Sequence, residues 1–286
     1  MRRAGDHGRP GFGDGEATAI VSAYDAAAPS FDRHRTLPDG VAETIRNAVI
    51  AAAGGVPRPL LLDIGTGAGR IGHTFVAAGD DYIGVDLSLG MLRTFLHRAT
   101  CSDASLGPAP LRLVRADGRC LPFVDTTFDV VLMIQIFGGM SDFPLLVSEA
   151  RRVLRPSGAV ILGRTVAAEH GVDARLKQRL ALILSEIGID AGDNSYDDVE
   201  QALHSAARSA ETVVAASWRT DRTARQFLER HRTGARFSAL PEPVKEEALQ
   251  QLAVWAVAMF GSLDAVFSEQ YAFALQVFKF GRGAPL

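Results

Sequence analysis

This 286-residue sequence has little cysteine and no excess of basic residues. The two cysteines, Cys101 and Cys120, are too few for a disulfide framework or a four-ligand zinc site, so a reducing compartment suits the chain. Lysine and arginine number 30 against 33 aspartate and glutamate residues, for a net charge of −3. Proteins that bind nucleic acid usually carry a basic excess, because they neutralise phosphates. The charge balance therefore argues against a nucleic-acid partner.

Long apolar runs are missing too. No uninterrupted apolar stretch reaches the ~18 residues that a bilayer-spanning helix needs, so no membrane span is expected. The first residues include two arginines but no apolar segment of the kind found in secretory signals. We therefore predict a cytoplasmic protein whose residues 1–17, rich in glycine and polar side chains, form a disordered tail.

What the sequence does contain is an alternation of short apolar segments with helical patterns. Five apolar segments are expected to be strands, at residues 60–64, 82–86, 111–116, 128–136 and 159–163. Such alternation predicts an α/β fold, with a parallel sheet covered by helices on both faces. Two later segments with strand-like composition, 211–218 and 270–280, are expected to add a sixth and a seventh strand.

The chain is longer than such a sheet requires. Besides the tail, residues 18–55 are predicted to form a helical lid over the site. Residues 220–269 are predicted to be an insertion between the last two strands, with helices near 222–230 and 244–260. Because the last strand returns to the sheet after this insertion, we expect residues 18–286 to form one domain with a helical cap.

A glycine-rich turn follows the first predicted strand, in the sequence LLLDIGTGAGR. Its glycines allow a tight turn and the close approach of a ligand, and the next helix points its N-terminus at that ligand. These glycines are Gly65, Gly67 and Gly69. The run GAGRIG at 67–72 formally matches the dinucleotide pattern G-x-G-x-x-G, but the turn already begins at Gly65.

Acidic residues accompany the ends of three predicted strands: Asp63, Asp86 and Asp117. A carboxylate at Asp63 would repel a pyrophosphate and favour a ligand that carries an ammonium or sulfonium group. An acid at the end of the second strand is typical of ribose binding. The three acids and the turn together predict a pocket for a cationic nucleoside.

Five segments in order resemble the successive motifs of class I S-adenosylmethionine (SAM)-dependent methyltransferases: LLLDIGTGAG, GVDLSLGML, RADGRCLPF, DTTFDVVLMIQIF and EARRVLRPSGAVIL. The similarity runs from Leu60 to Arg164 and is to the small-molecule branch typified by quinone-biosynthesis methyltransferases. It implies a Rossmann-like sheet of seven strands, the last antiparallel, and SAM as the cofactor. After the fourth strand the chain has neither an N/D-P-P-Y/F motif nor a Pro-Cys pair, which favours a small-molecule acceptor.

The resemblance also implies roles for individual residues. Asp86 would receive the ribose diol, Leu87 would pack on the adenine, and Asp117 would bind the adenine amino group. The full set of implied cofactor-binding residues is Asp63, Gly65, Thr66, Gly67, Asp86, Leu87, Met91, Asp117, Gly118 and Gln135.

The catalytic and acceptor-binding residues are less defined by the sequence. Two histidines are weak candidates for a general base, His34 in the predicted lid and His231 in the predicted cap. Candidates for acceptor binding are Tyr24, Phe31, His34, Phe137 and Trp218. A late arginine cluster (Arg219, Arg222, Arg225, Arg230, Arg232 and Arg236) would clamp an anionic substrate or, as we favour, form a solvated face paired with Asp221 and Glu229.

The predicted reaction is in-line SN2 transfer of the SAM methyl group to an oxygen, nitrogen or carbon nucleophile. Because the sulfonium is already a strong electrophile, orientation supplies much of the catalysis and a protein base is optional. Two alternatives are a non-catalytic SAM-binding protein on the same fold and, less favoured, an NAD-dependent oxidoreductase that uses GAGRIG. The sequence leaves the acceptor and the oligomeric state open.

Overall fold

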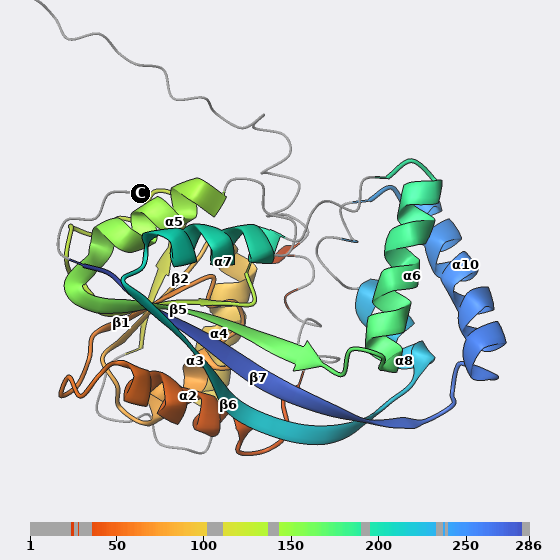
Figure 1. Cartoon of the computed structure of the whole chain (residues 1–286), viewed down its shortest axis with the longest axis horizontal. Helices are drawn as coiled ribbons and strands as arrows, with labels where there is room; N and C mark the ends of the chain where they lie inside the picture. The colour runs from red at the N-terminus through yellow and green to blue at the C-terminus, as the bar shows by residue number, and fades with distance from the viewer. Residues whose placement is uncertain are drawn as a thin grey trace, which may run out of the picture.

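The computed structural model describes Tyr24, Asp25, Ala28, Phe237 and residues 36–101, 111–136, 143–189, 195–232 and 240–281. These residues form a seven-stranded sheet in the order β3-β2-β1-β4-β5-β7-β6 (Figure 1). The strands are β1 Leu61–Ile64, β2 Tyr82–Asp86, β3 Arg112–Arg115, β4 Phe128–Ile134, β5 Leu154–Ala167, β6 Ser209–Arg222 and β7 Phe267–Lys279. The first five are parallel, and β7 runs antiparallel to β5 and β6. The predicted Rossmann-like sheet is confirmed.

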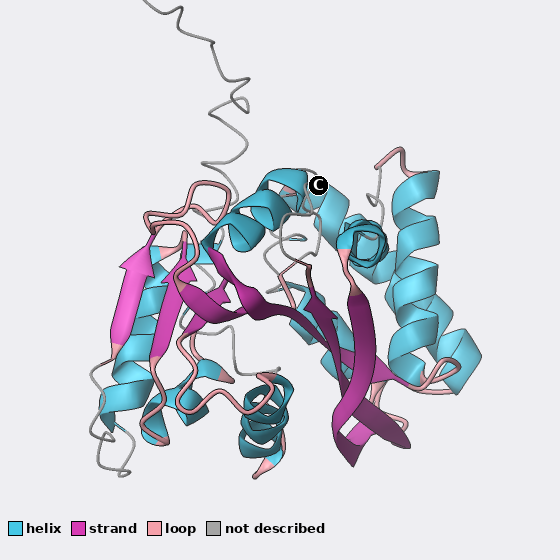
Figure 2. Ribbon diagram, turned by 60° about the vertical axis from the view of Figure 1, so that its left-hand side comes forward, coloured by secondary structure: helices cyan, strands magenta, loops and turns pink. Residues whose placement is uncertain are grey.

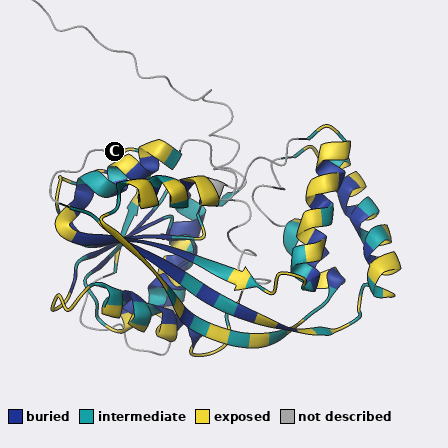
Figure 3. Cartoon of the chain, viewed as in Figure 1, coloured by how far each residue is buried: buried dark blue, intermediate teal, exposed yellow. Residues whose placement is uncertain are grey.

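Helices cover both faces of the sheet (Figure 2). One layer contains α2 Val41–Ala52, α3 Gly72–Ala77 and α4 Leu89–Cys101, and the other contains α5 Phe143–Val153 and α7 Ser195–Ala206. Successive strand residues point to opposite faces, so Leu61 packs in the first layer and Leu62 in the second, each fully buried. Figure 3 shows such buried residues along the central strands. Burial on both faces explains why these strands are nearly all apolar.

Three strands extend beyond their predicted ends. The fifth was expected at 159–163, yet β5 begins at Leu154, which pairs with Phe128 across an irregularity in the ladder. β6 and β7 pair from Ser209–Lys279 to Arg222–Phe267, well past the last β5–β7 pair, Ala167–Tyr271. Once β5 has ended, β6 and β7 continue as a two-stranded ribbon away from the sheet (Figure 1).

This ribbon leads to a helical cluster of α6 Val172–Glu186, α8 Ala224–Arg232 and α10 Glu242–Phe260. The apolar stripe of α6, which includes Leu176, Leu180 and Ile183, packs against Phe227 of α8 and Leu252 of α10 in one core. The cluster therefore combines the 220–269 segment with a helix that precedes β6. No helix in the described ranges is long and apolar enough to span a membrane.

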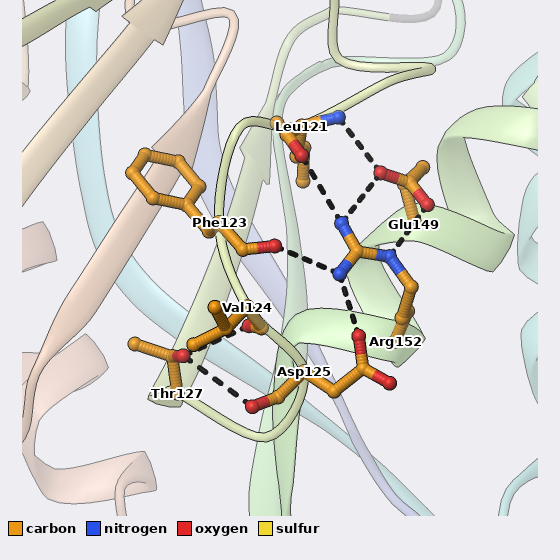
Figure 4. A network of polar contacts seen from close by, with 7 residues as sticks. All are labelled: Leu121, Phe123, Val124, Asp125, Thr127, Glu149 and Arg152. Carbon is orange, nitrogen blue, oxygen red and sulfur yellow. Dashed lines mark hydrogen bonds and ion pairs between the residues drawn. The ribbon is translucent and has the colours of Figure 1, made fainter.

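The segment between β3 and β4, which carries Asp117, is attached to α5 by Arg152 (Figure 4). The guanidinium donates to both carboxylate oxygens of Glu149 at 2.7 and 2.8 Å. It also donates to the Asp125 carboxylate and to the carbonyl oxygens of Leu121 and Phe123 at 2.7–3.1 Å. All five N–H groups of the arginine are used, so this connection is fixed by charge-assisted hydrogen bonds.

Candidate functional site

The glycine turn lies between β1 and α3, at the carboxyl edge of the sheet. Gly65, Gly67 and Gly69 have φ angles of 75°, 58° and 73°, in the left-handed region that disfavours other residues. A Cβ at Gly65 would lie 2.3 Å from Cγ2 of Ile136, which follows β4 and covers the turn. Backbone N–H groups of the turn already donate within the chain: Gly65 and Thr66 to the Val85 carbonyl, and Gly67 to Asp86. The φ angles and the close packing therefore favour glycine in this turn.

We expect Gly69→Ala to be strongly destabilising. The new Cβ would lie 2.1 Å from the ring of Phe95, which is fully buried, and the φ angle would be strained as well. Overpacking plus backbone strain predicts a loss of about 3 kcal/mol in the free energy of unfolding, measured by urea denaturation. Gly188→Ala is the matched control, because Gly188 has a φ of 77° but open space around it. Equal losses in the two variants would contradict the packing argument.

Asp63 lies within β1 and is only 4% exposed. Its Oδ2 accepts a hydrogen bond from the Tyr82 hydroxyl at 2.6 Å, and that hydroxyl lies 2.5 Å from Thr66 Oγ1. Oδ1 is buried and has no hydrogen-bond partner among the described residues. Burial raises the pKa of Asp63 to about 6. A buried carboxylate oxygen without a hydrogen-bond donor lowers the stability of the folded protein. Its presence fits a site that binds a cationic group.

Asp86 is the last residue of β2 and connects two turns. Its Oδ2 accepts from the Gly67 N–H at 2.8 Å, and its Oδ1 accepts from the Ser88 N–H at 2.9 Å. Burial raises the pKa of this carboxyl. Each oxygen keeps a lone pair, so the group can still accept from a diol. Leu87 beside it is 38% exposed and offers apolar surface at the same edge.

Residues from the predicted lid reach the turn after β2. Asp25 accepts from the Ser88 hydroxyl at 2.5 Å and from the Gly90 N–H at 2.8 Å, and these bonds lower its pKa. Ala28 is buried with Met91 and with Ala68 of the glycine turn, and Tyr24 packs on this group. Tyr24 and Met91 were candidates predicted from the sequence, but Asp25 was not, because its role depends on contacts with residues 63 and 65 positions away.

Asp117 and Gly118 follow β3. Burial disfavours ionisation of Asp117, but hydrogen bonds from the Arg119 guanidinium and N–H outweigh it and lower the pKa. The Asp117 carboxylate is thus paired with Arg119, a pairing that the sequence did not predict. A Cβ at Gly118 would lie 2.5 Å from Leu146 and 2.8 Å from Ile64, so this position requires glycine for packing.

The remaining candidates are the predicted acceptor-binding residues other than Tyr24 and the two histidines predicted as a general base. Phe31, His34 and Phe137 lie outside the described residues. Trp218 is on the β6–β7 ribbon, stacked on Tyr271 with ring centroids 6.0 Å apart. His231 is on α8, where its ring stacks on Phe227 and its Nδ1 lies 2.9 Å from the Phe227 carbonyl oxygen.

Four of the six late arginines are engaged in ion pairs, although not with the acids that we predicted, and Arg236 lies outside the described residues. Arg222 and Arg230 face Asp173 of α6 at 3.9 and 2.8 Å. Arg225 pairs with Asp264 at 2.6 Å, and Arg232 lies 3.5 Å from Glu246 of α10. The interpretation as a paired surface is therefore favoured, with Asp173, Asp264 and Glu246 in place of Asp221 and Glu229.

Two structural features separate this site from a dinucleotide site. β1 ends at Ile64, so the turn includes Gly65 and starts before the G-x-G-x-x-G match. The antiparallel β7 lies between β5 and β6, whereas the six-stranded dinucleotide fold is parallel in the order 3-2-1-4-5-6.

Comparison with known proteins agrees with this geometry. Residues 62–162 match the family described as "Methyltransferase domain". Two curated relatives match this chain over 144 residues, which is half of its length. They are the demethylmenaquinone methyltransferases of Renibacterium salmoninarum, 28% identical, and Streptomyces griseus, 31% identical. The matched part spans only 57% and 59% of those proteins. The crystal structure of the YcgJ protein from a Bacillus species superposes with a TM-score of 0.53 at 18% identity, covering 84% of this chain and 99% of that one.

Proposed function

Because residues 62–162 match a family of methyltransferase domains and the motifs along them resemble those of class I SAM-dependent methyltransferases, we propose that this chain binds SAM and transfers its methyl group to a small molecule. The observation that carries the proposal is the buried, half-partnered carboxylate of Asp63 behind a turn of left-handed glycines. A buried negative charge disfavours a pyrophosphate and favours the ammonium end of SAM. The relatives' names support a small-molecule acceptor.

The residues at this edge of the sheet fit this cofactor. Asp63 would hold the ammonium group of its amino-acid end, and the free lone pairs of Asp86 would accept from the ribose hydroxyls. Exposed Leu87 and the neighbouring Met91 would pack on the base. Asp117 would contact the adenine amino group only alongside its bonds to Arg119.

In this proposal the protein accelerates the reaction by positioning the two reactants. When bound, SAM supplies an electrophilic methyl group on a positively charged sulfur. Transfer would form a bond between that carbon and the acceptor's nucleophile and break the carbon–sulfur bond, whose electron pair would stay on sulfur. The protein's part is to align the two reactants and exclude water, which strengthens electrostatic interactions in the site. The Asp25 contacts would hold the lid over the cofactor, and the helical cap would select the acceptor.

Two measurements test the proposal. We expect S-adenosylhomocysteine (SAH) to bind in calorimetry and to raise the melting temperature, with no shift from NAD. We also expect transfer of radiolabel from methyl-labelled SAM into a pool of small aromatic and aliphatic acceptors. Stabilisation by NAD alone would favour an oxidoreductase. Tight SAH binding without transfer to any pool would favour a non-catalytic SAM-binding protein.

A further inference from the structure

Three polar side chains from separate elements meet at the carboxyl edge of the sheet: Arg70 at the end of the glycine turn, Gln135 after β4 and Thr165 in β5. Gln135 Oε1 accepts from the Arg70 guanidinium, and Gln135 Nε2 lies 2.7 Å from Thr165 Oγ1. The main-chain N–H of Gln135 donates to the Gly163 carbonyl at 2.9 Å. Gln135 has a φ of 55°, an uncommon conformation for a non-glycine residue that often marks functional sites.

The direction of this hydrogen-bond chain follows from chemistry. A guanidinium has donors only, so the amide oxygen of Gln135 must face Arg70 and the amide nitrogen must face Thr165. The Thr165 oxygen is then the acceptor, and its own hydrogen is directed elsewhere. Within the described ranges, no residue accepts that hydrogen. Thr165 is therefore a hydroxyl donor at the end of a chain that begins with a positive charge.

The surroundings of Thr165 indicate what this donor can bind. Thr165 pairs with Phe273 of β7, which is fully buried, and Ile136 covers Gly65 next to Gln135. Gln135 is exposed and Thr165 is partly exposed, so a ligand can reach this donor, and a hydrogen-bond chain that starts at a cation strengthens its terminal donor. An oxygen anion satisfies this donor and is stabilised by it, whereas a neutral amine presents further N–H donors and gains less.

We propose that Thr165 donates a hydrogen bond to an ionised oxygen of the methyl acceptor, a phenolate, enolate or carboxylate. Arg70 and Gln135 act as positioning residues that fix the direction of that donor. This inference rests on the proposed function and narrows its acceptor class. It assigns a role to Arg70 and Thr165, neither of which the sequence motifs single out.

The test uses two probes of nearly equal shape, 4-nitrophenolate and 4-nitroaniline, titrated by absorbance into the full chain saturated with SAH. We expect the wild type to prefer the phenolate. Thr165→Val should weaken phenolate binding about tenfold and leave the aniline unchanged, because only a bond to the charged oxygen is lost. Thr165→Ser should restore the preference, and Arg70→Met should reduce it. Thr100→Val, on the exposed surface of α4, is the control and should change neither probe.

Several outcomes would overturn the inference. They are equal affinity for the two probes in the wild type, no binding of either probe to the SAH complex, and equal losses of both probes in Thr165→Val. SAH calorimetry on each variant is the independent check: absence of SAH binding in the wild type refutes the proposed function itself. If Thr165→Val alone loses SAH binding, Thr165→Ser decides, because a preference missing in that variant refutes the role of the hydroxyl.

Discussion

Asp86→Ala is expected to weaken SAH binding about a hundredfold or more in calorimetry. The variant removes the carboxylate proposed to receive the ribose diol, and charge-assisted hydrogen bonds are each worth about 1.5–3 kcal/mol. It also frees the N–H groups of Gly67 and Ser88, which Asp86 holds at 2.8 and 2.9 Å. The variant should therefore lose both SAH affinity and the geometry of the two turns that Asp86 holds.

The matched control for this variant is Asp81→Ala, an acid just before the other end of the same strand. Among the described residues, the Asp81 side chain contacts only exposed Arg58, in a 3.4 Å ion pair, so its removal should leave SAH affinity within twofold. Asp86→Asn adds a second comparison, because it keeps one acceptor oxygen without the charge. A dissociation constant for Asp86→Ala within threefold of wild type would refute the ribose assignment.

Asp63→Asn is expected to stabilise the ligand-free protein while it weakens binding. Burial raises the pKa of Asp63 from 3.8 to about 6, so its ionised form costs about 3 kcal/mol of folding free energy well above that pH. The amide removes this cost but adds buried N–H donors that cost about 1–3 kcal/mol, so we expect a net gain of up to about 2 kcal/mol at pH 8. Urea denaturation measures the gain, and calorimetry should show at least tenfold weaker SAH binding.

The pH dependence of the wild type gives a second test. Because the folded-state pKa of about 6 lies above the unfolded value of 3.8, the folded protein binds the proton more tightly. This group therefore adds stability as the pH falls from about 7 to 4, and SAH affinity should decrease over the same fall as the carboxylate is neutralised. Asp63→Asn should lose the part of both dependences that comes from Asp63 and keep the part that comes from Asp86, whose pKa burial also raises. A variant that kept the wild-type pH profile would show that another group titrates.

Much of the fold was predictable because its signals are local. The apolar segments before Gly65 and Asp86 are short runs that suit buried parallel strands, and the structure places β1 and β2 at them within one residue. The larger departures occur where pairing partners decide the length. β5 extends back to Leu154 because Phe128 pairs with it, and β6 continues to Arg222 because β7 runs beside it. Such pairings carry no local sequence signal.

The sequence by itself determined the order of strands and helices, the glycine turn and the acids near the strand ends, since each depends on neighbouring residues along the chain. The tertiary structure alone decided which side chains meet there. Tyr82 reaches Asp63 across 19 residues, Arg70 reaches Gln135 across 65, and α6 leaves the sheet to pack with α8 and α10. The reason is physical: a side chain's partner, burial and pKa are set by the packing of separate elements, which the periodicity of one segment does not specify.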